Sequence, residues 1–187
     1  MGIILIKAAQ EYLAAYADAL ERGWSPSTEH DEARFHELHA ILHDPGTFLK
    51  RFDDRAAEAG PVRLPDGSLV PRLPGFRRWI WDGEFSGSIG LRWQSGTPEL
   101  PPHCLGHIGY SVVPWKRRRG YATQALAQIL PEARKEGLPY VEITTDLDNE
   151  ASQRVILANG GVLIEEFSAG RAHGDSVKLR YRINLSA

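Results

Sequence analysis

Cysteine is almost absent from this chain of 187 residues, in which Cys104 is the only one. A single thiol excludes an intramolecular disulfide framework and a zinc site built from cysteines. It also suits a reducing compartment, because disulfides are rare there. Cys104 stands at the start of a strand-like segment, and we interpret it as a packed thiol rather than an acyl carrier.

Long apolar runs are missing as well. The apolar stretch near the N-terminus covers only residues 3–6, which is too short for the core of a signal peptide. No stretch approaches the roughly 20 apolar residues that a membrane-spanning helix needs. We therefore expect a cytoplasmic protein that has no membrane partner.

The chain also lacks an excess of charge of one sign. It holds 22 lysine and arginine residues against 24 aspartate and glutamate residues, which gives a formal net charge of −2. Nucleic-acid-binding domains usually carry a basic excess, so we expect no nucleic-acid partner. The length and a hydrophobic content of 42% favour one globular domain over residues 1–187.

The spacing of apolar and turn residues predicts alternating helices and strands. We expect helices over residues 11–22, 31–43, 48–59, 122–136 and 149–157. We expect strands over residues 3–6, 103–113, 140–149, 162–167 and 177–185, and a hairpin over residues 77–93 that turns at Asp82-Gly83. Residues 60–75, rich in proline and glycine, are expected to form a long loop.

This order of elements predicts a mixed α/β fold. The strand–helix–strand unit over residues 103–149 requires two parallel strands with a right-handed crossover. The hairpin and the tail imply antiparallel pairing, so the sheet is expected to be mixed. The alternating tail strand, residues 177–185, could also pair with a partner chain, which makes a homodimer one hypothesis.

Three histidines, His36, His39 and His43, share one face of a predicted helix. The zinc-binding spacing H-E-x-x-H is missed by one residue in "HELHA". We therefore interpret them as polar-face residues and expect no metal.

The segment "PWKRRRGYATQAL" places four consecutive cations, Lys116 to Arg119, before Gly120 and a helix. The first turn of a helix has unpaired N–H groups and a partial positive charge, so it binds phosphate. Well-aligned basic side chains would add charge-assisted hydrogen bonds. The alternative is a solvated loop with a chance glycine. Neither G-x-G-x-x-G nor the P-loop pattern is present.

A third pattern fits. Arg117-x-x-Gly120-x-Ala122, after the strand ending "YSVVP", resembles the acyl-CoA pyrophosphate loop [QR]-x-x-G-x-[GA] of the GNAT superfamily of N-acetyltransferases. "TTDLDNEASQRVILANGGVL" resembles the second signature of that family, and "DGEFSGSIGLRW" resembles its preceding hairpin. The likeness covers residues 79–167 well, whereas residues 1–75 match only in outline.

The resemblance implies a GNAT-like three-layer fold with a central mixed sheet, two splayed parallel strands and flanking helices. Residues 79–167 would form the acetyl-CoA-binding core, and residues 1–75 a variable part on the substrate side. The backbone of Val112 and Val113 would hold the pantetheine arm and the thioester carbonyl, and Asn149 and Ser152 would contact the cofactor from the following strand end. The loop residues that would wrap the pyrophosphate are Arg117, Arg118, Arg119, Gly120, Tyr121 and Ala122.

The chemistry needs a base, a donor to the carbonyl oxygen and an acid for the thiolate. Backbone donors near Val112 would serve the oxygen. His107 is the first candidate base, because it lies on the strand where family members often place one and its reference pKa suits proton abstraction. A structural hydrogen bond is the alternative for His107, and Glu84 is a second candidate base.

Many family members carry a tyrosine acid on the helix after Asn149, and this chain has none there. Ser152 would act as the acid instead, or would satisfy backbone donors of the helix. The predicted function is acetyl transfer from acetyl-CoA to a primary amine of a small molecule or peptide, by direct attack in a ternary complex. The alternative is a non-catalytic acyl-CoA-binding or sensor module.

Overall fold

The computed structural model describes residues 2–27, 31–64, 66–173 and 175–185, so Pro65 of the predicted loop and both ends of the predicted domain lie outside it. The helices are α1 (Leu13–Glu21), α2 (Ala33–His43), α3 (Pro45–Lys50), α4 (Tyr121–Lys135) and α5 (Glu150–Ala158), with the 3-10 turns η1 (Gln10–Tyr12), η2 (Pro114–Lys116) and η3 (Arg171–His173). The strands are β1 (Ile4–Ile6), β2 (Asp53–Asp54), β3 (Val62–Arg63), β4 (Leu69–Val70), β5 (Gly75–Trp81), β6 (Phe85–Arg92), β7 (Ile108–Val112), β8 (Tyr140–Asp146), β9 (Val162–Ser168) and β10 (Val177–Asn184).

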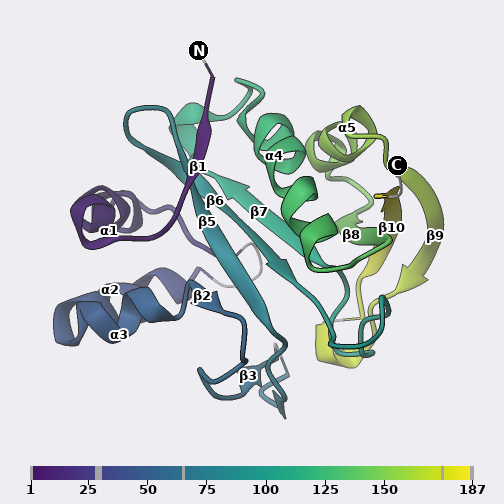
Figure 1. The fold of residues 1–187 in the computed structure, drawn as a ribbon, viewed down its shortest axis with the longest axis horizontal. Helices are drawn as coiled ribbons and strands as arrows, with labels where there is room; N and C mark the ends of the chain where they lie inside the picture. The colour runs from purple at the N-terminus through teal and green to yellow at the C-terminus, as the bar shows by residue number, and fades with distance from the viewer. Residues whose placement is uncertain (1, 28–30, 65, 174, 186–187) are drawn as a thin grey trace.

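The strands form two main sheets. The first has the order β1-β5-β6-β7, with β2 also paired to β5, and the second has the order β8-β10-β9. Every ladder in them is antiparallel. Helices α1 to α3 lie on one side of the first sheet and α4 and α5 on the other (Figure 1). The predicted mixed α/β class with three layers is therefore confirmed. The single mixed sheet with a parallel strand pair is wrong, because the strands divide into two main sheets whose described ladders are all antiparallel.

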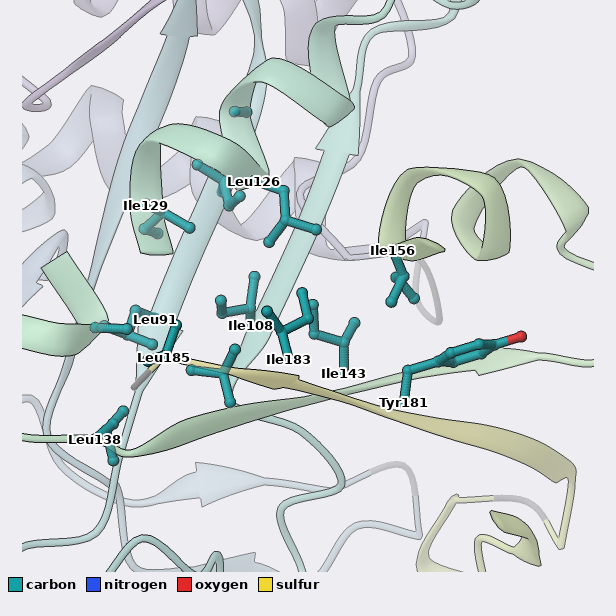
Figure 2. Close-up of a cluster of buried hydrophobic side chains, with 14 of the residues drawn as sticks. Leu91, Ile108, Leu126, Ile129, Leu138, Ile143, Ile156, Tyr181, Ile183 and Leu185 are labelled. Carbon is teal, nitrogen blue, oxygen red and sulfur yellow. The ribbon is translucent and has the colours of Figure 1, made fainter. Parts of the chain in front are cut away.

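Two hydrophobic clusters fill the layers. The cluster beneath α1 and α3 is aromatic, and in it Tyr16 stacks on Trp79 with ring centroids 4.6 Å apart. The cluster beneath α4 and α5 is mainly aliphatic and draws on both sheets (Figure 2). It contains Ile108 from the first sheet and Ile143 and Ile183 from the second. No ladder joins the two sheets in the described residues, so the shared apolar core contributes most of what holds them together.

The predicted helix over residues 48–59 is wrong. Helix α3 begins earlier, at Pro45, and ends at Lys50. Asp44 caps it by accepting a hydrogen bond from the backbone N–H of Thr47 at 2.9 Å, and proline is well suited to the first helical position. The Asp-Pro pair is thus the start signal, and β2 follows where the helix was expected to continue.

Two other predictions need adjustment. The long loop over residues 60–75 contains a small hairpin of β3 and β4. The strand expected from residue 103 begins only at Ile108, so His107 precedes it. Within the described ranges no helix combines the length and the hydrophobicity needed to cross a bilayer.

The tail strand β10 lies between β8 and β9 and pairs with both. Its alternation is confirmed, because Leu179, Tyr181 and Ile183 are buried against the helices. Both of its edges are occupied, so β10 does not offer a free edge to a partner chain. The homodimer stays a prediction, but pairing through β10, which suggested it, is no longer available.

Candidate active site

Strands β7 and β8, which flank α4 along the chain, lie in different sheets. Among the described residues they are joined through His107 and Glu142. The His107 N–H donates to the Glu142 carbonyl at 2.7 Å, and the Glu142 N–H donates to His107 Nδ1 at 2.9 Å. No ladder follows in the described part of β7, so its edge toward β8 is open. The predicted splay therefore takes the form of a break between two sheets, in place of a hydrogen-bonded parallel pair.

The neighbouring Gly106 allows the close approach that starts the break. A Cβ on Gly106 would lie 3.2 Å from the Glu142 carbonyl oxygen and 3.3 Å from the Thr144 nitrogen. Such contacts are tighter than nine in ten real Cβ contacts, so a side chain would require the backbone of β8 to shift slightly away. Only glycine fits here without movement of β8.

His107 itself is fully buried, and both of its ring nitrogens are engaged. Because Nδ1 accepts from Glu142, the neutral ring carries its proton on Nε2, which donates to the Pro98 carbonyl at 3.1 Å. Burial lowers the pKa of His107 to about 4. These contacts favour the structural role over the role of general base.

The loop after β7, residues 117–120, is the predicted cofactor loop, and it has the backbone expected of an anion site. Gly120 is left-handed, with φ of 74°, and so is Arg118, with φ of 61°. Gly120 is the N-cap of α4, and no described side chain caps this helix. The first-turn N–H groups from Tyr121 onward therefore face outward without an intrahelical partner. Arg117, Arg118 and Arg119 are all exposed beside them.

Lys116 departs from the expected cluster. Its side chain is only 8% exposed, and its Nζ donates to Asp82 Oδ1 at 2.7 Å and to Ser86 Oγ at 3.2 Å. Three cations rather than four are thus available to a phosphate. The fourth is neutralised by the turn between β5 and β6.

A cleft of about 580 Å³ lies between the loop and the start of α5. Its lining includes Arg118, Asn149 and Arg154. The structure therefore brings together the basic loop and the Asn149 signature, which are far apart in the sequence.

The backbone of β7 shows which groups face the opening. The Val113 N–H donates to the Ser86 carbonyl at 3.1 Å, and the Val113 carbonyl accepts from the Lys116 N–H at 3.0 Å. Because backbone groups alternate in direction along a ladder, those of Tyr110 and Val112 point to the opposite edge, toward β8. The contacts thus favour Val112 and argue against Val113 as a backbone ligand. The Val112 carbonyl accepts from Arg117 Nε at 3.3 Å.

Ser152 lies in the first turn of α5, opposite Tyr110 of β7. The Tyr110 hydroxyl is 2.8 Å from Ser152 Oγ. The Ser152 N–H donates to Asn149 Oδ1 at 3.0 Å, so Asn149 is the N-cap of the helix. Burial raises the pKa of Tyr110 to about 12, with the hydrogen bond to Ser152 opposing it, so this hydroxyl stays protonated.

Tyr110 is the functional candidate that the sequence reasoning missed. The helix after Asn149 has no tyrosine, but Tyr110 reaches Ser152 of that helix from strand β7. The alternation of β7 carries the signal, because Tyr110 shares a face with Ile108 and Val112, which pack beneath α4 and α5.

Glu84 lies elsewhere. Its side chain is 80% exposed, forms an ion pair with Lys116 at 3.2 Å, and lines a smaller pocket of about 220 Å³ that also includes Phe85 and Trp115. Its role as a base stays a prediction.

The helix histidines His36, His39 and His43 are exposed on α2. The rings of His39 and His43 are 4.1 Å apart. Over the described part of the chain, no three histidine, cysteine, aspartate or glutamate side chains are grouped so that they could hold a metal ion.

A family model described as "Acetyltransferase (GNAT) domain" matches residues 25–162. No curated protein matches the chain. Among solved structures, the microcin C7 self-immunity acetyltransferase MccE in complex with acetyl-CoA and AMP has a TM-score of 0.64 at 13% identity, over 98% of this chain and 92% of its own. RimJ of Mycobacterium smegmatis in complex with CoA-disulfide has a TM-score of 0.67 at 18% identity, over 97% of this chain and 81% of its own. The putative acetyltransferase yncA of Salmonella typhimurium with its cofactor acetyl-CoA has a TM-score of 0.58 at 16% identity, over 100% and 95%.

At such low identity the solved structures show the fold alone. The family model covers well over half of the chain, and the cofactor loop and the Asn149 helix start both lie within the matched residues. The chain therefore belongs to the GNAT acetyltransferase family.

Proposed function

We propose that this protein transfers an acetyl group from acetyl-CoA to a primary amine of a small molecule or peptide, by direct attack within a ternary complex. One observation carries the proposal. The open edge of β7 is followed, after the turn η2, by a basic loop in which Arg118 and Gly120 are left-handed, and then by the uncapped start of α4. The open strand edge suits an extended arm, and the loop with the helix start suits a phosphate group. A ligand with an extended arm followed by a phosphate group would therefore fit both.

The residues present fit acetyl-CoA at both ends. The first-turn N–H groups of α4 and the exposed side chains of Arg117 to Arg119 match a pyrophosphate. The backbone groups of Tyr110 and Val112 at the open edge would pair with the amides of the pantetheine arm. Asn149 uses its carbonyl oxygen to cap α5, which leaves its amide N–H groups for the same arm.

When bound, acetyl-CoA supplies an activated acyl carbon. The amine nitrogen forms a bond to that carbon, the carbon–sulfur bond breaks, and the amine loses one proton while the thiolate gains one. The Val112 N–H at the open edge would stabilise negative charge on the carbonyl oxygen. The Ser152 hydroxyl would deliver the proton to the thiolate, with Tyr110 holding its orientation.

The acceptor would enter from the opposite face of β7, beneath the N-terminal helices. Trp24, just after α1, donates from Nε1 to Ser111 Oγ at 3.0 Å, so the segment after α1 is fastened to that face. Ser111 and Tyr110 are neighbours in β7, so their side chains point to opposite faces of the strand. The proposed acceptor side and the proposed cofactor side would therefore be separated by this one strand.

The test is release of thiol from acetyl-CoA across a panel of amines that includes a polyamine, amino acids, a lysine peptide and a peptide with a free N-terminus. Turnover with any of them supports the proposal, and Ser152→Ala should slow it about a hundredfold, as loss of a general acid does. Acetyl-CoA binding in calorimetry without turnover would favour the sensor module. Absence of binding would contradict both.

A further inference from the structure

The turn between β5 and β6 reaches across to the cofactor loop through Asp82. Its Oδ1 accepts from Lys116 Nζ at 2.7 Å, and its Oδ2 accepts from the Tyr121 hydroxyl at 2.6 Å. Lys116 is the last residue before the loop of residues 117–120, and Tyr121 is the first residue after it. One carboxylate therefore holds both ends of the loop.

These contacts are shielded from water. The side chains of Asp82 and Lys116 are 9% and 8% exposed, and Tyr121 is 5% exposed. Burial alone would raise the pKa of Asp82, but the hydrogen bonds from Lys116 and Tyr121 outweigh it and hold the pKa well below its usual range. A buried ion pair contributes little net stability because both charges lose water, yet its geometry is specific.

The loop between these anchors needs such support. Arg118 is left-handed although it is not glycine, which is a costly conformation that persists only where the surroundings enforce it. The first-turn N–H groups of α4 have no described side-chain cap to order them. With both ends fixed, residues 117–120 have little freedom left to lose when an anion binds.

We propose that Asp82 is a positioning residue that pre-organises the cofactor loop and so raises the affinity for coenzyme A without touching it. The inference rests on the proposed function in one respect, namely that the loop binds the pyrophosphate. It does not depend on which amine is the acceptor or on which residue transfers the proton.

The sharpest variant is Tyr121→Phe, which removes one anchor and leaves the Asp82–Lys116 pair in place. Asp82→Asn weakens both anchors. The matched control is Tyr16→Phe, because Tyr16 is also buried and also donates its hydroxyl to a carboxylate, that of Glu37. Its ring packs against Trp24, Trp79 and Phe85, and none of these belongs to the loop. All variants are compared at a temperature where thermal unfolding shows each to be folded.

Two binding constants and the rate of amide hydrogen exchange separate a positioning role from a merely structural one. The Kd for coenzyme A in calorimetry should rise about tenfold in Tyr121→Phe, as expected for loss of one hydrogen bond to a charged group, and further in Asp82→Asn. The Kd for S-acetylpantetheine, which lacks the pyrophosphate, should not change. Amide hydrogen exchange should speed up in residues 117–123 and not in β10, and Tyr16→Phe should change neither quantity.

Unchanged loop exchange and unchanged Kd for coenzyme A in both variants would overturn the inference. So would an equal loss of affinity for S-acetylpantetheine, because the effect would then not act through the phosphate loop. If the unmodified protein binds no coenzyme A, the proposed function fails, and the exchange rates of residues 117–123 still decide whether Asp82 holds the loop.

Discussion

The buried imidazole of His107 should make the stability of this protein depend on pH in a defined window. In the folded protein the pKa of His107 is about 4, because burial outweighs the Glu142 carboxylate that opposes it, while Arg92 adds to the lowering. In the unfolded chain we expect the ordinary value of 6.5. Between these values the unfolded chain binds a proton that the folded protein does not, so stability falls as the pH is lowered.

The size of this effect follows from the two values. A difference of about 2.5 in pKa, at about 1.36 kcal/mol each, corresponds to about 3 kcal/mol lost once the pH has fallen below 4. That is a sizeable share of the 5–15 kcal/mol that typically stabilises a domain. Protonation also removes a contact between β7 and β8, because a protonated Nδ1 can no longer accept the hydrogen bond from the Glu142 N–H.

The assay is denaturant unfolding at several pH values from 7 to 4.5, with His107→Asn as the reference. Asparagine offers a carbonyl oxygen near the position of Nδ1 and does not titrate. The neighbouring carboxylates are the same in both proteins, so their titration contributes equally to both curves. The free energy of unfolding of the unmodified protein should fall more steeply than that of His107→Asn, by up to about 1.36 kcal/mol per pH unit below pH 6.5. If the two proteins lost stability with pH at the same rate, His107 would not be a buried neutral imidazole that links β7 to β8.

Three further predictions concern the loop, the strand tyrosine and a helix start. Gly120→Glu should abolish acetyl-CoA binding in calorimetry, because a φ of 74° is strained for any side chain and a negative charge would occupy the phosphate site; unchanged affinity would contradict this. Tyr110→Phe should slow thiol release roughly tenfold and leave the Kd for coenzyme A within about twofold, since only the orientation of Ser152 is lost; a larger effect on Kd than on turnover would assign Tyr110 to binding instead. Asp44→Ala should lower the free energy of unfolding by about 1 kcal/mol through loss of the cap on α3, measured in denaturant, with no effect expected on coenzyme A affinity.

Much of the fold could be predicted because its signals are local. The amphipathic spacing of α4, the Asp82-Gly83 turn and the alternation of β10 each lie within a few residues, and all three are present in the structure. The cofactor loop is local too, because a strand end, a glycine and a helix start are contiguous in the chain. The misplaced helix follows the same rule, since the Asp44-Pro45 pair that starts α3 is also a local signal.

The sequence by itself thus determined most of the helices and strands, the family resemblance and the place of the basic, glycine-containing loop before α4. The tertiary structure alone decided which side chains meet. Tyr110 and Ser152 are 42 positions apart, Asp82 and Tyr121 are 39 apart, and His107 and Glu142 are 35 apart. A run of four cations does not reveal that Lys116 turns inward, because that depends on a carboxylate brought in by another hairpin. The physical reason is that periodicity assigns a residue to a face, whereas its partner depends on how the faces of distant elements pack.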